Sequence, residues 1–247
     1  MRKRGIAVFL AVLLMGAVAQ AAPPTGEGWE AIFNGENLDG WEIRSGHQNI
    51  WTVVDGVIDC NPRADLPGEN SLWTKDSYGD FSLHVEWRIK ETKGKYPMPT
   101  VLPDGSDEKD QNGNTIIELR PNADSGLYLR GSSKSQVNIW CWPVGSGEVY
   151  GYRTDAKMSD EVRAGVTPNT NADNPVGEWN TFVITLRGNL LTVELNGQMV
   201  IENASLPGVP SGGPIALQHH GGYDVEKDKW NAASSLVQFK NLYLKKL

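Results

Sequence analysis

The chain has 247 residues, a formal net charge of −7, and 39% hydrophobic residues. This length and hydrophobic content allow one large core, and the acidic balance argues against nucleic acids and acidic membrane surfaces as partners. The 27 glycines and 9 tryptophans are typical of a β-rich chain with tight turns and aromatic surfaces.

The first 21 residues have the organisation of a secretory signal peptide. The basic start Arg2-Lys3-Arg4 precedes an apolar run over residues 6–19, and Ala19-Gln20-Ala21 fits a cleavage site with small residues. The run is short for a membrane span, and a retained anchor helix is the alternative. We therefore expect a protein exported to the periplasm or outside the cell, with no transmembrane segment. Its mature chain, residues 22–247, is expected to form one domain with a charge of −10, because three positive charges leave with the signal.

Two cysteines, Cys60 and Cys141, lie in apolar surroundings typical of strands. In an exported protein they could form a disulfide, and two separate buried thiols are the alternative. Their spacing fits no zinc motif.

Period-two alternation of apolar and polar residues predicts many short strands. The predicted strands are Gly28–Phe33, Trp51–Val54, Val57–Cys60, Ser71–Thr74, Phe81–Ile89, Thr181–Arg187, Leu190–Leu195, Gln198–Glu202, Pro214–His220 and Leu236–Leu244. Asp55-Gly56, Gly188-Asn189 and Asn196-Gly197 are hairpin turn signals. The polar segments 91–114 and 143–178 show no periodicity and are expected to be long loops, and no amphipathic helix is expected. This pattern predicts an all-β sandwich or barrel.

The segment Ile116–Trp140 is interpreted as three further strands separated by two polar turns. One face of these strands combines hydrogen-bonding side chains with aromatic rings, which is typical of a site for a polar ring compound. That face carries Glu118, Arg120, Tyr128, Arg130, Gln136, Asn138 and Trp140. We expect the face to be a ligand site, and a solvated sheet face is the alternative.

The order of these segments resembles the 3-keto-disaccharide hydrolase family over roughly residues 28–247. The matching phrases are Phe33-Asn34-Gly35, Leu38-Asp39-Gly40-Trp41, Trp51-Thr52-Val53-Val54-Asp55-Gly56-Val57-Ile58, Tyr78-Gly79-Asp80-Phe81, Glu86-Trp87-Arg88, Asp124-Ser125-Gly126-Leu127-Tyr128-Leu129-Arg130-Gly131, Gly177-Glu178-Trp179-Asn180, Leu195-Asn196-Gly197, Leu217-Gln218-His219-His220-Gly221 and Phe239-Lys240-Asn241-Leu242. The resemblance implies a concanavalin A-like jelly-roll β-sandwich of two antiparallel sheets. It also implies an exported bacterial protein that acts on glycosides oxidised at carbon 3.

Four positions depart from the pattern of this family. The family usually has Asn where this chain has Asp124. Many members have Glu and Asp where this chain has Gln136 and Cys141, and many have Asp where it has His219.

A 3-keto sugar is primed for cleavage because its ketone acidifies the hydrogen on carbon 2. A base removes this proton, an enolate forms, and the group on carbon 1 leaves; later addition of water would complete a hydrolysis. Such a site needs a base, donors or a cation for the enolate, and an acid for the leaving oxygen. A divalent metal bound by the ketone could supply the cation, and no other cofactor is expected.

His220 is the first candidate for the base, because it ends a predicted strand beside the Gly221-Gly222 turn. Its alternative role is structural, as a histidine bonded to a loop carbonyl. Glu118 and Glu86 are the candidate catalytic carboxylates, and salt bridges to arginine are their alternative. His220 and Glu118 are also the candidate metal ligands.

The residues expected to bind substrate extend along the same polar and aromatic face. They are Arg130, Tyr128, Gln136, Asn138, Trp140, Gln218 and Arg120, and weaker catalytic candidates are His84, Tyr150 and Tyr152. On an extended strand, His219 and His220 would face opposite ways.

Three functions remain open from the sequence. The first is an enzyme that cleaves 3-keto-glycosides, and the second is a non-catalytic carbohydrate-binding module of the same fold. An exported structural or adhesive protein is weaker, because we find no internal repeats. A glucanase is disfavoured, because the nearest match to its Glu-x-Asp-x-x-Glu strand, Glu226 to Asn231, lacks the last acid. The sequence does not predict an oligomeric state.

Overall fold

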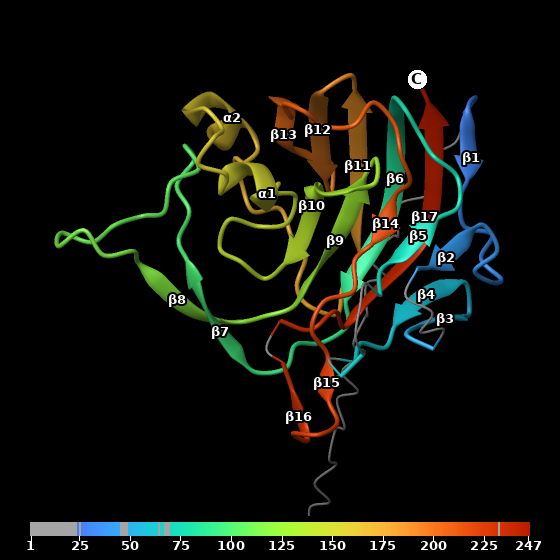
Figure 1. The fold of residues 1–247 in the computed structure, drawn as a ribbon, viewed down its shortest axis with the longest axis horizontal. Helices are drawn as coiled ribbons and strands as arrows, with labels where there is room; N and C mark the ends of the chain where they lie inside the picture. Colours follow the sequence, from blue (N-terminus) through green and yellow to red (C-terminus); the bar gives the residue numbers. More distant parts are fainter. Residues whose placement is uncertain (1–23, 25, 45–48, 64, 67–69, 232) are drawn as a thin grey trace, which may run out of the picture.

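The computed structural model of the chain describes residues 24, 26–44, 49–63, 65–66, 70–231 and 233–247. The predicted signal peptide, residues 1–21, lies outside the described residues. Two antiparallel sheets pack face to face in the described part, and smaller elements gather at one side of them (Figure 1). The predicted two-sheet β-sandwich is confirmed.

The larger sheet has eight strands and contains the strands that the predicted hairpin turns connect. Its order is β13 (Gln198–Ser205), β12 (Leu190–Leu195), β11 (Asn180–Arg187), β6 (Phe81–Ile89), β17 (Val237–Lys246), β4 (Val57–Cys60) and β3 (Trp51–Val54), with β1 (Trp29–Ala31) paired to β17. Asp55 and Gly56 join β3 to β4 with φ values of 51° and 76°, and Asn196 and Gly197 join β12 to β13 with 52° and 79°. Positive φ at both central residues is what a two-residue hairpin turn requires, which explains these turn sequences.

The smaller sheet has five strands and carries the functional face. Its order is β10 (Ser132–Trp140), β9 (Asp124–Leu129), β14 (Ala216–Leu217), β5 (Leu72–Thr74) and β2 (Trp41–Ile43). Leu127, Leu129, Val137 and Ile139 are fully buried in the core between the sheets. Because strand side chains alternate, their neighbours on β9 and β10 point to the outer face of this sheet.

The segment 91–114 is not the loop that its polar sequence predicts. It begins a two-stranded hairpin of β7 (Lys95–Pro99) and β8 (Ile117–Pro121), which projects from the sandwich at the left of Figure 1. Met98 is fully buried and anchors the hairpin, whereas Leu119 is 63% exposed. Because β8 pairs only with β7, the expected three-stranded face over Ile116–Trp140 is divided between two sheets.

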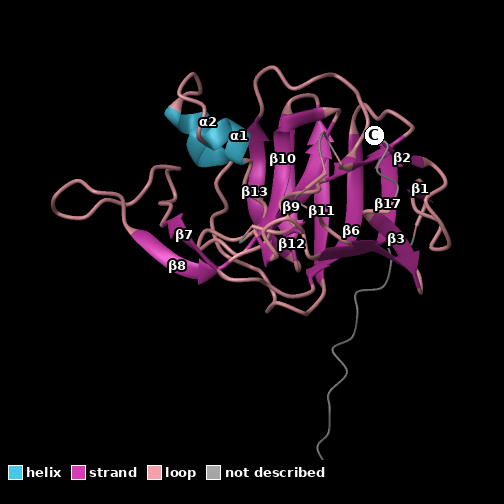
Figure 2. Ribbon diagram, turned by 60° about the horizontal axis from the view of Figure 1, so that its bottom comes forward, coloured by secondary structure: helices cyan, strands magenta, loops and turns pink. Residues whose placement is uncertain are grey.

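The second predicted loop, 143–178, contains two short helices, α1 (Tyr150–Arg153) and α2 (Asp160–Gly165). Figure 2 shows both helices on the side of the sandwich where β10 and β13 lie. Ser159 caps α2 by accepting a hydrogen bond from the amide of Val162. Helices of four and six residues are too short to produce a detectable apolar period, which explains why the sequence prediction missed them.

The remaining described elements are small. A two-stranded hairpin is formed by β15 (Tyr223–Asp224) and β16 (Lys229–Trp230). Cys60 is buried and Cys141 partly buried, and both are free thiols, so the disulfide alternative is wrong for this structure. None of the helices in the described part of the chain is long and apolar enough to cross a membrane.

Candidate functional site

A cavity of about 370 Å³ opens on the outer face of the smaller sheet, between that sheet, α1 and β7. We call it the amide cavity, because four amide side chains line it. Its lining residues are Tyr96, Asn122, Asp124, Ser133, Gln136, Asn138, Trp140, Trp142, Tyr150, Gly151, Gln218, His220 and Ala233.

Strand register brings the polar residues of this cavity together. In the antiparallel pair of β9 and β10, Asp124 is opposite Trp140 and Gly126 is opposite Asn138. On the other side of β9, the backbone amide of Gln218 donates to the carbonyl of Gly126. Gly126 is needed here, because a Cβ at this position would lie 2.4 Å from Nε2 of Gln136. The missing side chain thus leaves room for the Gln136 side chain beside β9, where its Nε2 donates to the carbonyl of Ser125 at 3.1 Å.

The amide side chains of the cavity are held in fixed orientations. Asn138 donates from Nδ2 to the carbonyl of Glu148 at 2.9 Å. With its amide turned so that both atoms are paired, Gln218 accepts from the Tyr128 hydroxyl at 3.1 Å and donates to Oδ1 of Asp124 at 3.3 Å. Oδ1 of Asn122 is buried and accepts no hydrogen bond from the described residues. The amide side chains of the cavity therefore present hydrogen-bonding groups in fixed positions, which suit a ligand with several hydroxyls.

Three aromatic residues also line the cavity. The rings of Trp140 and Trp142 stack with centroids 4.4 Å apart and an interplanar angle of 9°. Tyr150 meets both indoles edge-on, at centroid distances of 6.1 Å and 6.0 Å. Nε1 of Trp140 donates to the carbonyl of Gly145 at 2.7 Å, which fixes the pair. Aromatic rings beside amide side chains can hold a sugar ring. The aromatic rings contact the apolar face of the sugar, and the amides bond its hydroxyls.

His220 and Asp124 form the ionisable pair of the cavity. Nδ1 of His220 lies 2.7 Å from the carbonyl oxygen of Ala233, and Nε2 lies 3.9 Å from Oδ2 of Asp124. A carbonyl oxygen can only accept a hydrogen bond, so Nδ1 carries the hydrogen. In the neutral ring Nε2 therefore keeps its lone pair and is available as a base.

The backbone around this pair is tightly cross-linked. The amide of His220 donates to Oγ of Ser235, and the same hydroxyl donates to the carbonyl of Asp124. Gly221 has a φ of 56°, and a Cβ there would lie 2.3 Å from the Ala233 carbonyl oxygen. Glycine thus permits the close approach that positions the imidazole ring.

Burial shifts the acid–base properties of the site. It raises the pKa of Asp124 from 3.8 to about 6, and the neighbouring His220 acts in the opposite direction. Burial also raises the pKa of Glu148, whose carbonyl holds Asn138, to about 7, against the lowering effect of Arg153. A carboxyl group that titrates near neutral pH can give and take protons during catalysis.

Comparison with protein families identifies the family of this chain. The family model described as the 3-keto-alpha-glucoside-1,2-lyase-like domain matches residues 28–245. The chain belongs to this family. The family resemblance stated from the sequence is thereby confirmed, and the chain is a carbohydrate-active domain.

Solved structures with a similar fold come from Parabacteroides distasonis ATCC 8503, and each is named a "putative glycosyl hydrolase". One has a TM-score of 0.55 and 21% sequence identity, and the match covers 90% of this chain and 84% of that chain. A second has a TM-score of 0.53 and 19% identity, with 90% of this chain and 94% of that chain covered. These likenesses show the fold. A comparison with curated proteins finds no match.

Several residues predicted for this family member line the amide cavity. They are His220, Gln136, Asn138, Trp140, Gln218 and the weaker candidate Tyr150. Tyr128 lies beside the cavity, where it packs against Trp73 with a centroid distance of 5.7 Å and contacts Gln218. That these side chains bind or convert a substrate stays a prediction.

Glu118 and Arg120 do not line the cavity, contrary to expectation. Both lie on the projecting strand β8, where Nε of Arg120 pairs with Oε2 of Glu118 at 2.7 Å. Their side chains are 40% and 45% exposed. The strand itself was predicted, but it belongs to a different sheet, and its apolar residues Ile117 and Leu119 are exposed.

Arg130 is also misplaced by the sequence interpretation. β9 ends at Leu129, and Arg130 has a φ of 50°, so strand alternation no longer sets its direction. Its guanidinium is buried and donates to the carboxylate of Asp80 and to four backbone carbonyls. With its donors used in this way, Arg130 ties loops together and does not fit a substrate-binding role.

Glu86 lies on β6 of the other sheet. Its side chain is 1% exposed, pairs with Nζ of Lys240 at 3.3 Å and accepts from Nδ2 of Asn241 at 2.7 Å. His84, on the same strand, is bonded to the carbonyl of Asn241, and Tyr152 donates to the carbonyl of Pro207. None of these three candidate catalytic residues, Glu86, His84 and Tyr152, lines the amide cavity.

The two adjacent histidines diverge, as expected. Nε2 of His219 accepts from the amide of Arg63 at 3.3 Å, whereas His220 lines the cavity. The divergence persists although β14 ends at Leu217.

A metal bound by His220 and Glu118 does not fit this arrangement. No group of three or more His, Cys, Asp or Glu side chains gathers within the described part of the chain. Of these ligand types only His220 and Asp124 line the cavity, and metal sites held by protein usually use three or more ligands.

The sequence interpretation missed Asp124, Asn122, Trp142 and Tyr96. Asp124 shares the parity of Tyr128 on β9, so alternation alone could have identified it. Trp142 lies beyond the end of β10, and Tyr96 lies on the hairpin that was expected to be a loop. No periodic signal points to these two residues.

Proposed function

We propose that the protein cleaves 3-keto-glycosides by elimination across carbons 1 and 2 of the oxidised ring. The observation that carries the proposal is the His220–Asp124 pair, with Nε2 of His220 3.9 Å from Oδ2 of the carboxyl group, inside a cavity lined by amides and indoles. The family description, which names a lyase acting on 3-keto-glucosides, supports the reaction class.

His220 acts as the base in this mechanism. Nε2 takes the proton from carbon 2, and the electron pair of that bond forms the enolate with the ketone at carbon 3. The pair then re-forms the ketone while carbons 1 and 2 become doubly bonded and the bond from carbon 1 to its oxygen breaks. The hydrogen bond from Nδ1 to Ala233 keeps the ring in the tautomer that this step requires.

Asp124 supplies the proton to the leaving oxygen. Its raised pKa, about 6, keeps a useful fraction protonated near neutral pH. After one turnover His220 is protonated and Asp124 is ionised. A proton transfer from Nε2 to Oδ2 then restores the pair, so one proton enters from carbon 2 and one leaves with the alcohol. The net products are the unsaturated keto sugar and the free alcohol.

The amide side chains hold the substrate and its enolate. Gln136, Gln218 and Asn138 present polar groups in orientations fixed by their hydrogen bonds. Hydrogen-bond donors that need no reorganisation stabilise developing negative charge efficiently. The Trp140–Trp142 wall supports the apolar face of the sugar ring.

A divalent metal is not assigned a step, because the described residues offer too few ligands for it. That turnover requires a divalent metal bound by the ketone stays a prediction. Turnover measured before and after treatment with a chelator, and again after adding back divalent ions, tests it directly.

The experiment that tests the function measures release of alcohol from a methyl 3-keto-glucoside and from a 3-keto-disaccharide. His220→Ala should reduce kcat by about 10²- to 10⁴-fold, the usual contribution of a general base. His219→Ala is the matched control, because that ring lies against Arg63, and it should retain activity.

Two results would decide against the proposal. Full turnover in His220→Ala would remove the base from the mechanism. Binding of keto-glycosides by the wild-type protein without any turnover would instead support the carbohydrate-binding module, which the same amides and indoles could also serve.

A further inference from the structure

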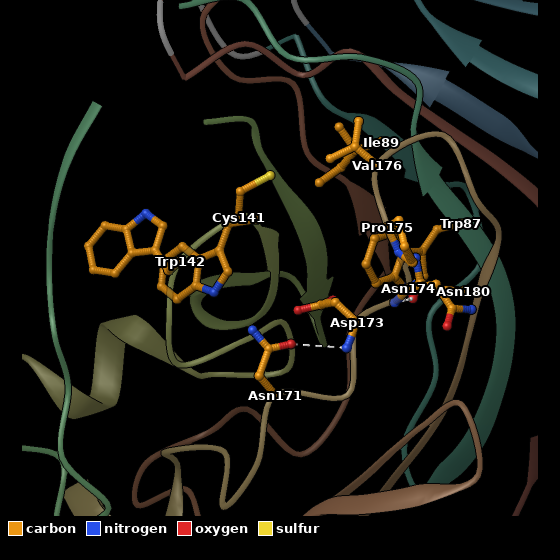
Figure 3. A pocket seen from close by; sticks show the side chains of 11 residues that line it. Trp87, Ile89, Cys141, Trp142, Asn171, Asp173, Asn174, Pro175, Val176 and Asn180 are labelled. Carbon is orange, nitrogen blue, oxygen red and sulfur yellow. Dashed lines mark hydrogen bonds between the residues drawn. The ribbon is translucent and has the colours of Figure 1, made fainter. Parts of the chain in front are cut away.

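A second cavity, of about 270 Å³, lies at the end of the sandwich beside the amide cavity. We call it the indole pocket. Its lining residues are Trp87, Ile89, Trp140, Cys141, Trp142, Asn171, Asp173, Asn174, Pro175, Val176 and Asn180. Figure 3 shows Trp142 on one side and Trp87 with Pro175 on the other, with Asp173 and Asn171 between them.

Two polar atoms in the walls of the indole pocket lack hydrogen-bond partners among the described residues. They are the donor Nε1 of Trp87 and the acceptor Oδ1 of Asp173, and both are buried. Trp87 as a whole is only 1% exposed. A buried polar group without a partner costs about 1–3 kcal/mol, so a pair of them marks a place where a ligand can be favoured.

Several other polar atoms of the pocket already have hydrogen-bond partners. Oδ2 of Asp173 accepts from the amide of Ser146 at 2.8 Å, and Oδ1 of Asn171 accepts from the amide of Asp173 at 3.0 Å. Oδ1 of Asn180 accepts from the amide of Asn174 and from Nδ2 of Asn196. The donor of Trp87 and the acceptor of Asp173 are the two buried polar groups of the lining that a ligand could satisfy, and hydroxyl groups both donate and accept.

The charge of the lining limits the class of ligand. No Lys, Arg or His is among the described residues that line the pocket, and the one acidic side chain is Asp173. This lining would repel an anion. Indole rings beside hydrogen-bonding groups suit a neutral sugar ring, and the volume is below that of pockets for drug-sized ligands.

The indole pocket and the amide cavity share a wall. Trp140 and Trp142 line both spaces, and their rings are stacked. We propose that the indole pocket is a second sugar subsite, which holds the neutral unit attached to carbon 1 of the ring bound in the amide cavity. The inference rests on the proposed function for the order of the two rings.

Cys141 provides a direct probe of occupancy. It lines the indole pocket and is a free thiol, whereas the other cysteine, Cys60, is fully buried. Alkylation of Cys141 by iodoacetamide, measured by peptide mass spectrometry at mildly alkaline pH, should be slowed by maltose, cellobiose or trehalose. A disaccharide that carries a uronic acid should protect less. Cys60 in the same digest is the internal control.

Two variants connect this protection to the proposed contacts. Asp173→Asn retains an oxygen for the Ser146 amide but replaces the unpartnered acceptor, and Trp87→Phe removes the indole donor. Each should weaken protection by about tenfold, the effect of one hydrogen bond. Asp160→Asn, on the exposed start of α2, is the matched control. If Trp87→Phe does not fold, Asp173→Asn still tests the pocket.

Turnover separates this inference from the proposed function. The two variants should raise KM for a 3-keto-disaccharide while leaving kcat/KM for methyl 3-keto-glucoside unchanged. If turnover occurs but no neutral disaccharide protects Cys141, the second subsite is wrong and the proposed function stands. Protection without any turnover would support the subsite and remove the proposed reaction.

Discussion

A single backbone carbonyl decides which nitrogen of His220 can act as a base. The Ala233 carbonyl binds the hydrogen on Nδ1, so the free lone pair of Nε2 is directed to the side of Asp124. His219, one residue earlier, has no such arrangement, because its Nε2 accepts from the Arg63 amide. The difference between two adjacent histidines is thus one of hydrogen-bond partners, which a sequence does not display.

The first prediction concerns Asp124 as the acid. In the wild type, kcat should fall as the pH rises through about 6, because Asp124 loses the proton that the leaving oxygen needs. Asp124→Asn should lower kcat by about 10- to 100-fold and remove this decline, because an amide does not titrate. The pH dependence of alcohol release from methyl 3-keto-glucoside measures both effects.

The Asp124→Asn substitution also introduces the residue that the family usually has at this position. Equal kcat and an unchanged pH profile in this variant would show that the carboxyl group is not the acid, while leaving His220 as the base. Asp155→Asn, on the surface beside Lys134, controls for a general effect of removing one negative charge.

At the level of elements, the ends of strands decide which predicted residues reach the site. Period two correctly placed Gln136, Asn138 and Trp140 on the outer face of β10. The same rule failed for Arg130, because β9 ends one residue earlier and the backbone turns into the left-handed region. Arg130 instead links strand ends and loops that come together at that edge of the sandwich.

The second prediction follows from this role of Arg130. Arg130→Ala should lower the free energy of unfolding by about 3–5 kcal/mol, because it leaves buried carbonyls and Asp80 without their donor. Urea denaturation measures the loss. Arg120→Ala is the control, because its ion pair with Glu118 is exposed and should contribute less than about 1 kcal/mol. Similar stability losses in the two variants would contradict the structural role.

The third prediction concerns Glu86 on β6. Glu86→Gln should leave kcat unchanged, because this carboxylate lies in the other sheet and does not line the amide cavity. It should destabilise the fold by about 1–3 kcal/mol, because Lys240 loses its partner at 3.3 Å. Parallel assays of turnover and thermal unfolding separate these effects, and a tenfold loss of kcat in a fully folded variant would restore Glu86 as a catalytic candidate.

At the scale of the whole molecule, the sequence was sufficient for the fold but not for the assembly of the site. The turns at Asp55-Gly56 and Asn196-Gly197 have the positive φ values that their residues favour, so their hairpins were predictable. The amide cavity, in contrast, is completed by Tyr96 from the projecting hairpin and Tyr150 from a four-residue helix. Neither element has a period long enough to be recognised, and their packing on the sheet depends on tertiary contacts.

Three buried acids give the whole molecule an unusual dependence of stability on pH. Burial raises the pKa of Asp124 to about 6, that of Glu148 to about 7, and that of Asp173 above its ordinary value. An acid whose pKa is raised by folding binds more protons in the folded state than in the unfolded state. The free energy of unfolding therefore falls as the pH rises between the two pKa values. For Asp124 this window runs from 3.8 to about 6, and for Glu148 from 4.5 to about 7.

The fourth prediction is that the protein unfolds at a higher temperature near pH 5 than at pH 8, and that Asp124→Asn reduces this difference. The amide bears no charge to bury, so the variant should be more stable than the wild type at pH 8 by about 1–3 kcal/mol, since one pKa unit corresponds to 1.36 kcal/mol. Below about pH 3 the two proteins should differ little, because Asp124 is protonated in both the folded and the unfolded state there. Thermal melts across this range measure the effect.

A wild-type site that gains stability when its carboxyl group is removed, while losing turnover, indicates that the charge is retained for chemistry. If Asp124→Asn is equally destabilising at every pH, the carboxyl group has a structural role instead.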